Sequence, residues 1–513
     1  MFRADERHPA VWAAKTPDRP AVIDARDGSV ITFAQVEARS NKVAHLMRRS
    51  GLKPGDHAAV FLENRPDYTL IVWGMLRAGL RVTAIPTHLT PEEIDYILAD
   101  SGARLLITSQ AKRDAARQLK APGVKTRLMA DGEGDGYASL DAALAELPTT
   151  RIEDEVEGVE MLYSSGTTGQ PKGVRKPLPD GPFGTPVKGW WISAERFGLD
   201  ENTVYLHPAP LYHAAPLGYA LRVLRFGGTY ISVPRFDAEQ CLHLIEKYRV
   251  NRSQWVPTHF FRLLRLPADV RAKYDVSSLG VAIHAAAPCP REVKAAMIDW
   301  WGPVLEEYYA GSEGNGMTTI TSAEWLRKPG SVGQAKIGRL HICDEEGEEL
   351  PVGSEGLVYY SDSPVFEYHN DPEKTAESRN RHGWSTLGDV GYVDEDGYLF
   401  LTDRQSFMIV SGGVNIYPQE IENTLLTHPA VLDAAVIGVP NPEFGEEVKA
   451  VIETREPHTP ALAEELIKHC RTHLSHVKCP RSVDFTDQLP RGDNGKLYKR
   501  KLREIYWKDA RLP

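Results

Sequence analysis

Cysteine is scarce in this sequence, and its placement excludes a disulfide framework. Only five cysteines occur among 513 residues, and no two of them form a Cys-x-x-Cys pair. An odd and scattered set is typical of a protein kept in a reducing compartment. The five are Cys241, Cys289, Cys343, Cys470 and Cys479.

Long apolar runs and an excess of positive charge are also missing. The first twenty residues are charged and contain no apolar core of a secretory signal. No apolar run approaches the roughly 18–20 residues that span a bilayer. The net charge of −10 argues against a nucleic-acid or membrane-surface partner. The sequence therefore predicts a cytoplasmic protein with no integral membrane segment and no nucleic-acid partner.

Internal repeats and low-complexity tracts are absent, and short apolar runs alternate with helical patterns instead. Residues 57–79 are typical of a strand, a turn and a helix, and residues 104–109 of another strand. A helical face followed by a short strand appears at 241–257. Strands that alternate with helices predict an α/β fold with parallel sheets covered by helices on both faces.

The pattern changes after about residue 335. Residues 383–404 contain Asp396-Gly397 between two strand-like runs, which is a hairpin signal and indicates a small antiparallel β unit. The last hundred residues, with strand-like runs in 428–453 and a helical pattern at 461–474, indicate a compact α+β domain. The boundary between the two is expected near residues 403–406.

Residues 164–174, with the sequence SSGTTGQPKGV, are the clearest candidate for a phosphate-binding loop. The apolar run at 159–163 predicts a strand that ends at this loop. Three glycines allow the backbone to approach an anion, and four hydroxyls and a lysine supply donors. The loop is not a Walker motif, because Pro171 replaces the second glycine; a turn without a ligand is the alternative. The predicted phosphate-binding residues are Ser164, Ser165, Gly166, Thr167, Thr168, Gly169 and Lys172.

Polar candidates also occur farther along the chain. Ser312 and Glu313 place a hydroxyl beside a carboxylate, and hard oxygen ligands of this kind suit Mg²⁺. Asp389, at a predicted hairpin edge, can accept hydrogen bonds from two sugar hydroxyls. Arg404 closes the same β unit, and Lys496 lies in a glycine-rich turn before a basic helix. Each has a plain structural alternative when taken alone: a surface acid, a turn aspartate, an ion pair and a terminal charge run.

Taken together, six motifs resemble, in order and spacing, the core motifs of the adenylate-forming superfamily. That superfamily includes acyl-CoA synthetases, adenylation domains of peptide synthetases and luciferases, and this chain looks most similar to bacterial fatty-acyl-CoA and aryl-CoA synthetases. The resemblance covers nearly the whole chain. The motifs are SSGTTGQPKGV, YAGSE (309–313), LGD (387–389), DR (403–404), SGGVNIYPQEIE (411–422) and PRGDNGK (490–496).

The resemblance implies two half-reactions. A carboxylate attacks the α-phosphorus of ATP, which gives an acyl-AMP and releases pyrophosphate, and the thiol of CoA then attacks the acyl carbon and releases AMP. The loop with Lys172 would hold the two leaving phosphates. Mg²⁺ bound by Glu313 and Ser164 would offset charge near the α-phosphate.

The resemblance also implies roles around the nucleotide. Tyr309 would stack on adenine, and Ala286 would lie along the adenine edge. Asp389 would hold the ribose hydroxyls, Arg404 would orient the nucleotide, and Ser312 would line the same site beside Glu313.

Domain movement is implied as well. Lys496 would contact the carboxylate and the α-phosphate during adenylation, and after a rotation Ser411, Gly412 and Gly413 would form a channel for the pantetheine arm of CoA. The predicted domains are a large adenylation domain of parallel α/β subdomains with a small β unit, a hinge, and a small mobile α+β domain. They span residues 1–403, 404–406 and 407–513.

Three positions depart from the family pattern. Ser406 occupies the hinge position, where Asp or Lys is usual, and Phe407 occupies the following acidic position. We expect Ser406 to supply backbone freedom and Phe407 to pack between the domains. Leu387 stands where Thr usually precedes Gly-Asp, which removes a hydroxyl near the ribose.

The resemblance places the acid substrate between residues 212–218, 255–260 and 285–287. These segments are mostly apolar and small, with no positive charge for a second carboxylate and no acid for an amino group. A hydrophobic monocarboxylic acid is therefore expected. His213 would gate the approach of the carboxylate, with a hydrogen-bonded structural histidine as the alternative.

The predicted function is ATP-dependent synthesis of an acyl-CoA, with a fatty acid as the expected substrate and with ATP, Mg²⁺ and CoA as cofactors and co-substrate. An aryl- or steroid-acid–CoA ligase and a free-standing enzyme that loads a carrier protein are the main alternatives. Luciferase-like oxygenation and a degenerate relative that only binds nucleotide are further ones. The sequence leaves the assembly open, with a homodimer among the options.

Overall fold

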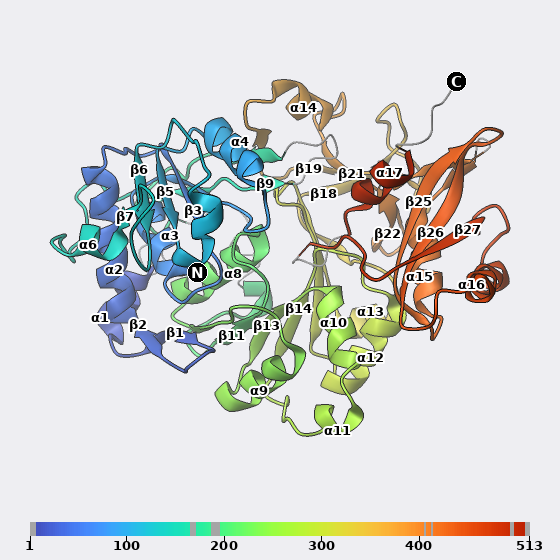
Figure 1. Ribbon diagram of the computed structural model, residues 1–513, viewed down its shortest axis with the longest axis horizontal. Coiled ribbons are helices and arrows are strands. Elements are labelled where there is room, and N and C mark those ends of the chain that lie inside the picture. The colour runs from blue at the N-terminus through green and yellow to red at the C-terminus, as the bar shows by residue number, and fades with distance from the viewer. Residues whose placement is uncertain are drawn as a thin grey trace.

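The computed structural model describes residues 7–164, 171–185, 195–404, 407–411, 414–492 and 497–507. The chain forms a large part that contains several sheets and a smaller C-terminal part (Figure 1). The predicted α/β class, with parallel sheets in the large part and a small α+β part, is confirmed.

A parallel sheet of six strands lies at the N-terminal end of the large part. All of its strand pairs are parallel, and the strands predicted in 57–79 and 104–109 are β3 and β5 of this sheet. In order across the sheet, the strands are β7 (Ala138–Ser139), β6 (Thr126–Met129), β5 (Leu105–Thr108), β3 (His57–Phe61), β4 (Arg81–Ala84) and β8 (Val159–Glu160).

A nine-stranded sheet forms the centre of the molecule. Its six inner strands pair in parallel, and antiparallel strands close both edges. In order, the strands are β17 (Gln334–Ile337), β16 (Met317–Thr321), β15 (Leu305–Tyr309), β14 (Val281–His284), β13 (Arg252–Trp255), β11 (Val204–His207), β12 (Thr229–Ser232), β1 (Pro20–Asp24) and β2 (Val30–Thr32).

Three helices fill the space between these two sheets: α2 (Phe33–Arg49), α3 (Tyr68–Arg77) and α8 (Ala214–Arg225). Every residue of α3 is buried, because one core cluster surrounds it with side chains from both sheets. Gly74 of α3 lies so close to Val43 of α2 that a Cβ atom would clash. This middle layer explains why α3 is apolar on all sides, as expected for a helix with no exposed face.

The outer faces of both sheets carry further helices. Helix α4 (Pro91–Ser101) packs in the cluster outside the six-stranded sheet, and it begins with a reciprocal Thr90–Glu93 capping box and ends at the left-handed Gly102. Helices α9, α10 and α12 cover the outer face of the nine-stranded sheet. These and the shorter helices of the large part are α9 (Ala238–Tyr248), α10 (Pro257–Leu264), α12 (Arg291–Trp301), α1 (Pro9–Lys15), α5 (Arg113–Ala116), α6 (Leu140–Leu144), α11 (Ala268–Arg271), α13 (Ser322–Arg327) and the 3₁₀ helix Gln110–Lys112.

The predicted antiparallel β unit is present. Its hairpin from 383–404 turns at Gly397, whose φ of +80° favours glycine. A second, three-stranded sheet lies beside it and receives the end of the phosphate-loop candidate. The four-stranded sheet contains β18 (Arg339–Cys343), β19 (Gly356–Ser361), β21 (Ser385–Val393) and β22 (Leu399–Arg404), and the three-stranded sheet contains β20 (Glu367–Tyr368), β10 (Lys172–Arg175) and β9 (Tyr163–Ser164).

The sequence predicted one strand over the apolar run at 159–163, and this prediction is wrong. It divides into β8, in the six-stranded sheet, and β9, in the three-stranded sheet. The chain therefore leaves one sheet and enters another within this run. Periodicity could not indicate the division, because both halves are short and apolar.

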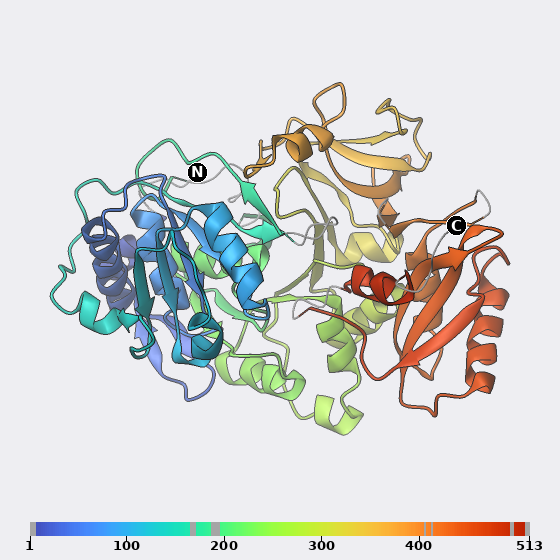
Figure 2. The same ribbon diagram turned by 45° about the horizontal axis from the view of Figure 1, so that its top comes forward.

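The C-terminal part is a five-stranded sheet with helices on both faces. Helices α15 and α16 cover one face, and α17 covers the other. The Arg265 guanidinium of the large part donates a hydrogen bond of 2.7 Å to the Leu432 carbonyl oxygen of the smaller part; Figure 2 shows the two parts from another side. The elements are β23 (Ile409–Ser411), β24 (Val414–Ile416), α15 (Pro418–Leu426), β25 (Val431–Asn441), β26 (Gly445–Thr454), α16 (Pro460–His473), β27 (Ser482–Thr486) and α17 (Lys499–Trp507).

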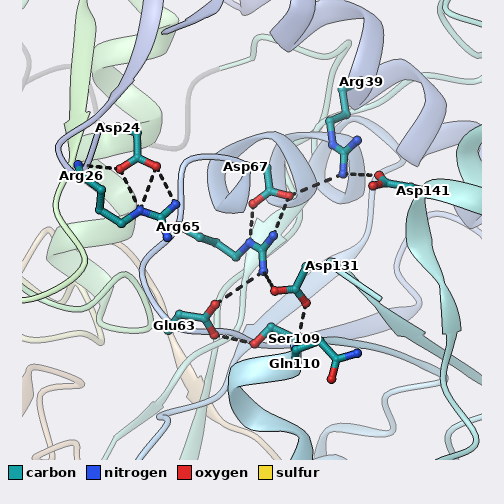
Figure 3. A network of polar contacts seen from close by, with 10 residues as sticks. All are labelled: Asp24, Arg26, Arg39, Glu63, Arg65, Asp67, Ser109, Gln110, Asp131 and Asp141. Atoms are coloured by element: carbon teal, nitrogen blue, oxygen red, sulfur yellow. Dashed lines mark hydrogen bonds and ion pairs between the residues drawn. The ribbon is translucent and has the colours of Figure 1, made fainter. Parts of the chain in front are cut away.

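Ion pairs hold the turn between β3 and α3. Arg65 donates to Asp67 at 2.5 Å and to Asp131 at 3.1 Å, so the turn is tied to the loop after β6 (Figure 3). Arg39 of α2 pairs with the same Asp67 and with Asp141. The network is mostly half-exposed, and its expected role is to position this end of the middle layer.

Within the part of the chain that the structure describes, no helix is both long enough and apolar enough to cross a bilayer.

Candidate functional site

The phosphate-loop candidate is closed at its base by a strand pair. Lys172 of β10 lies opposite Ser164 of β9, so both ends of the loop are fixed in one antiparallel ladder. The loop residues Ser165, Gly166, Thr167, Thr168 and Gly169, and the side chain of Ser164, lie outside the described residues. The structure describes the two paired strands, β9 and β10, between which the loop runs.

Lys172 has a partner that the sequence did not indicate. Its Nζ atom donates a hydrogen bond of 3.0 Å to Oδ2 of Asp371, and its side chain is only 17% exposed. Asp371 also accepts from the backbone N–H of Lys374 and so caps α14 (Pro372–Glu377). That backbone hydrogen bond and the Lys172 ammonium hold the pKa of Asp371 below its usual range. The candidate phosphate ligand is thus held by a carboxylate in this structure.

Strand β20 connects Lys172 with the candidate metal ligand. Tyr368 of β20 pairs with Val174 of β10, and its hydroxyl donates to Oε1 of Glu313 at 3.1 Å. The Lys172 ammonium lies 5.9 Å from the centroid of the Tyr368 ring. Glu313 is 8% exposed. Lys172 and Glu313, which are far apart in sequence, therefore belong to one site.

The adenine and ribose candidates also meet. The Tyr309 hydroxyl donates a 2.6 Å hydrogen bond to Oδ2 of Asp389, which is 5% exposed. Asp389 of β21 lies opposite Arg404 of β22 in the hairpin ladder, although the Arg404 side chain is outside the described residues. The three predicted nucleotide residues are thus brought together by β15, β21 and β22.

The departure at Leu387 has a structural counterpart. Leu387 lies against Gly311, where a Cβ atom would clash with its Cδ1 atom and would lie 2.8 Å from Oε2 of Glu313. An apolar side chain therefore packs on the turn that carries Glu313, where the family pattern places a hydroxyl.

Two other predicted residues lie at exposed positions. Ala286 is exposed and has a φ of +77°, a conformation that costs energy for any residue with a Cβ atom. Ser312 is exposed next to buried Glu313. Strained backbone of this kind is frequent at ligand sites, so Ala286 is consistent with its predicted place along a base.

Histidines gather at the start of α8. His213 is the residue before the helix, and its ring lies 4.5 Å from that of Tyr212, whose hydroxyl is 3.4 Å from Nδ1 of His88. Behind them, Nδ1 of buried His207 accepts from the backbone N–H of Ala209. Burial, and then the charge of His213, lower the pKa of His207 to about 3, so its ring is neutral.

A positive charge lies close to one of the predicted acyl segments. Arg222 lies on α8, and its Nη2 atom would be 3.5 Å from a Cβ atom on Gly218. Arg222 lies beyond residue 218, the last residue of that predicted segment. The helical spacing of four residues between Gly218 and Arg222 was the available signal.

In the C-terminal part, Ser411 is buried at the end of β23, while Gly412, Gly413 and Lys496 lie outside the described residues. Arg491 and Leu497, which flank the Lys496 segment, form an antiparallel bridge. Their pairing fixes the base of the segment.

Phe407, beside the predicted hinge, lies with its ring 5.3 Å from the Lys499 ammonium. Lys499 in turn pairs with Glu422 of α15 at 2.8 Å. Phe407 therefore contacts the C-terminal part itself.

The acidic side chains of the site do not form a metal cluster within the described part of the chain. Among the described residues, no group of three or more His, Cys, Asp or Glu side chains could hold a metal ion by itself. A buried carboxylate such as Glu313 can still contribute one ligand to a Mg²⁺ ion whose other ligands are phosphates and waters, which is the usual arrangement for this ion.

Comparison with known proteins identifies relatives over nearly the whole chain. The model of the AMP-binding enzyme family matches residues 10–367, and that of the AMP-binding enzyme C-terminal domain matches residues 420–496. A feruloyl-CoA synthase of Amycolatopsis is 34% identical over 97% of this chain and 98% of its own. A long-chain-fatty-acid–CoA ligase of Mycobacterium tuberculosis is 30% identical over 96% and 97%. The ATP-bound structure of MatB from Rhodopseudomonas palustris is 29% identical, with a TM-score of 0.83 over 98% of this chain and 99% of that one.

Proposed function

Since this chain belongs to the family of AMP-binding enzymes and is an acid–thiol ligase, we propose that it activates a carboxylic acid with ATP and transfers the acyl group to CoA. In the first step an acid oxygen bonds to the α-phosphorus while the bond to pyrophosphate breaks. In the second step the CoA sulfur bonds to the acyl carbon while AMP leaves with the electrons of the broken C–O bond.

The observation that carries this proposal is the junction of the phosphate-loop base with the nucleotide residues. Lys172, Tyr368 and Glu313 form one contact chain, and Tyr309, which donates to Asp389 of β21, is the last residue of the strand that precedes Glu313. A polyphosphate and a nucleoside therefore have adjacent candidate ligands, as a reaction at the α-phosphate requires.

Lys172 and the loop would take the two leaving phosphates, with Asp371 as the partner that the ammonium gives up. Glu313 and Ser164 would hold Mg²⁺, which when bound neutralises charge around the reacting phosphate. Glu313 is suited to this because its position is fixed by Tyr368 and by the glycine turn around Gly311.

Tyr309 and Ala286 would bind the adenine. The Asp389 carboxylate would accept hydrogen bonds from the ribose hydroxyls, and would share its oxygens between them and the Tyr309 hydroxyl. Arg404 would orient the nucleotide from the adjacent strand, and Ser312 would complete the polar edge. His213 would guide the incoming carboxylate at the start of α8.

The two steps would use two faces of the C-terminal part. We place the large domain at residues 1–403, the hinge at 404–406 and the mobile domain at 407–513. Lys496 would stabilise charge during adenylation, and Ser411, Gly412 and Gly413 would line the path of the CoA arm. Magnesium, a cytoplasmic location and a homodimer belong to this proposal as well; the scattered cysteines support the location.

The acid substrate is proposed to have a largely hydrophobic body, with a fatty acid and an aryl or steroid acid as the two forms to separate. The predicted acyl segments are mostly apolar, and the relatives act on acids of both kinds according to their names.

The test is a screen for pyrophosphate release with fatty, aryl and steroid acids, each with ATP and with or without CoA. We expect acid-dependent release, with repeated turnover and thioester product only when CoA is present. Absence of release with every acid would refute adenylation. Turnover with a carrier protein but not with CoA would refute the choice of thiol.

A further inference from the structure

Arg222 belongs to a polar cluster between the two parallel sheets, on the helix that begins at His213. Its guanidinium carbon lies 4.6 Å from the centroid of the Tyr219 ring, and that ring lies 6.2 Å from the ring of Tyr308. Tyr308 directly precedes Tyr309, the adenine candidate. The cluster therefore lies immediately behind the proposed nucleotide site.

Hydrogen bonds extend this cluster across the sheet. The Tyr205 hydroxyl donates to Oε1 of Gln254 at 3.0 Å, and Nε2 of Gln254 donates to the Tyr308 hydroxyl at 3.2 Å. Burial raises the pKa of Tyr308 to about 12, and the charge of Arg222 opposes that shift. Tyr308 is thus a neutral hydroxyl held in place near a guanidinium.

A second cation, Lys176, connects the cluster with Glu313. Its Nζ atom would lie 4.0 Å from a Cβ atom on Gly314, the residue after Glu313. Burial lowers the pKa of Lys176, while the carboxylates of Glu160 and Glu313 act in the opposite direction. Within the described residues, the Lys176 ammonium makes no hydrogen bond of its own.

These polar groups are less deeply buried than the apolar side chains around them. Arg222, Tyr308 and Lys176 are half-buried, whereas Leu221 and Val223, the neighbours of Arg222 on α8, are fully buried. Positive charge held in such surroundings is favourable when an oxygen acceptor shares the space.

We propose that Arg222, assisted by Tyr308 and Lys176, binds an oxygen acceptor on the acid substrate, at the end remote from the reacting carboxylate. The substrate class is then an acid with an apolar body and a distal hydroxyl or carboxylate. This inference rests on the proposed function, because it takes the space along α8 as the acid site. The sequence led us to expect a hydrophobic acid, and this inference restricts the expected substrate to such acids that carry a second polar group.

The test measures pyrophosphate release by the full-length enzyme with cinnamic acid and with its para-hydroxy and para-carboxy derivatives. An unsubstituted alkanoic acid and its terminal hydroxy derivative form a second set. Because a hydrogen bond to a charged group is lost with the unsubstituted acid, we expect kcat/KM to favour the oxygenated acid by at least about tenfold. The para-hydroxy and para-carboxy arms show which oxygen is bound.

Arg222→Met should remove this preference and leave turnover of the unsubstituted acid within about threefold of wild type, since only the distal contact is lost. Arg222→Lys should retain part of the preference. Lys247→Met, which removes an exposed charge on α9, is the matched control and should change neither acid. A purely structural role for Arg222 would lower both rates together and leave their ratio unchanged.

Equal kcat/KM values for both members of each set in the wild-type enzyme would overturn the inference even if the variants failed to fold. An unchanged preference in folded Arg222→Met would also overturn it. If none of the acids supported pyrophosphate release, the proposed function would be refuted, and this inference with it. The two failures are therefore distinguishable.

Discussion

Asp371→Asn offers the most direct test of how Lys172 works. In the structure the Lys172 ammonium donates to Oδ2 of Asp371 at 3.0 Å, and the proposed function requires this ammonium to bind phosphate instead. Asparagine retains the N-terminal cap of α14, because its side-chain oxygen can still accept from the Lys374 N–H. The substitution therefore removes the competing charge with little other change.

The expected change in KM for ATP follows from how exposed the Lys172–Asp371 pair is. The two side chains are 17% and 34% exposed, so solvent screens their attraction. A pair of this kind contributes about 0.2–1 kcal/mol. If ATP binding must release Lys172 from Asp371, removal of the charge should lower KM for ATP by up to about fivefold, since about 1.4 kcal/mol corresponds to a tenfold change.

The assay is the initial rate of pyrophosphate release as a function of ATP at saturating acid. Glu373→Gln is the matched control, because Glu373 is an exposed acid in the first turn of the same helix and lies outside the Lys172 pair. Its KM should equal that of wild type. A KM for Asp371→Asn that is unchanged or higher would show that Asp371 does not compete with ATP, and the reasoning would be wrong.

Three further predictions concern the reaction and stability. Lys496→Ala should abolish acyl-AMP formation from acid and ATP but spare thioester formation from supplied acyl-AMP; equal loss of both, measured separately, would exclude the assigned role. Glu313→Gln should raise the Mg²⁺ concentration needed for half-maximal pyrophosphate release, whereas Tyr368→Phe keeps the carboxylate and should do so less; identical titrations would argue against Glu313 as a ligand. The fold lowers the pKa of His207 to about 3, whereas the pKa of a histidine in the unfolded chain is about 6.5. Between these values the unfolded chain binds a proton at this residue and the folded protein does not. The stability that His207 provides is complete above about pH 6.5 and is lost as the pH falls toward about 3, and His207→Gln should reduce that dependence of the unfolding free energy by up to about 1.4 kcal/mol per pH unit; parallel curves for the two proteins would contradict this.

Local sequence determined much of the fold. The strands in 57–61 and 105–108 and the hairpin that turns at Gly397 follow from periodicity and turn chemistry, which act over a few residues. The six ordered motifs likewise indicated the family without any structure. The division of the run 159–163 between two sheets is different, because it depends on which partner strands are nearby.

The contacts that give the site its chemistry were decided by tertiary structure. Asp371 reaches Lys172 across 199 residues because β20 pairs with β10, and Tyr368 meets Glu313 through the same pairing. Arg222 could be placed on a helix from sequence, but the direction of its side chain depends on how α8 lies between two sheets. Periodicity and turn residues describe neighbours along the chain, whereas charge pairing and burial at a site depend on strands and helices that only the folded chain brings together.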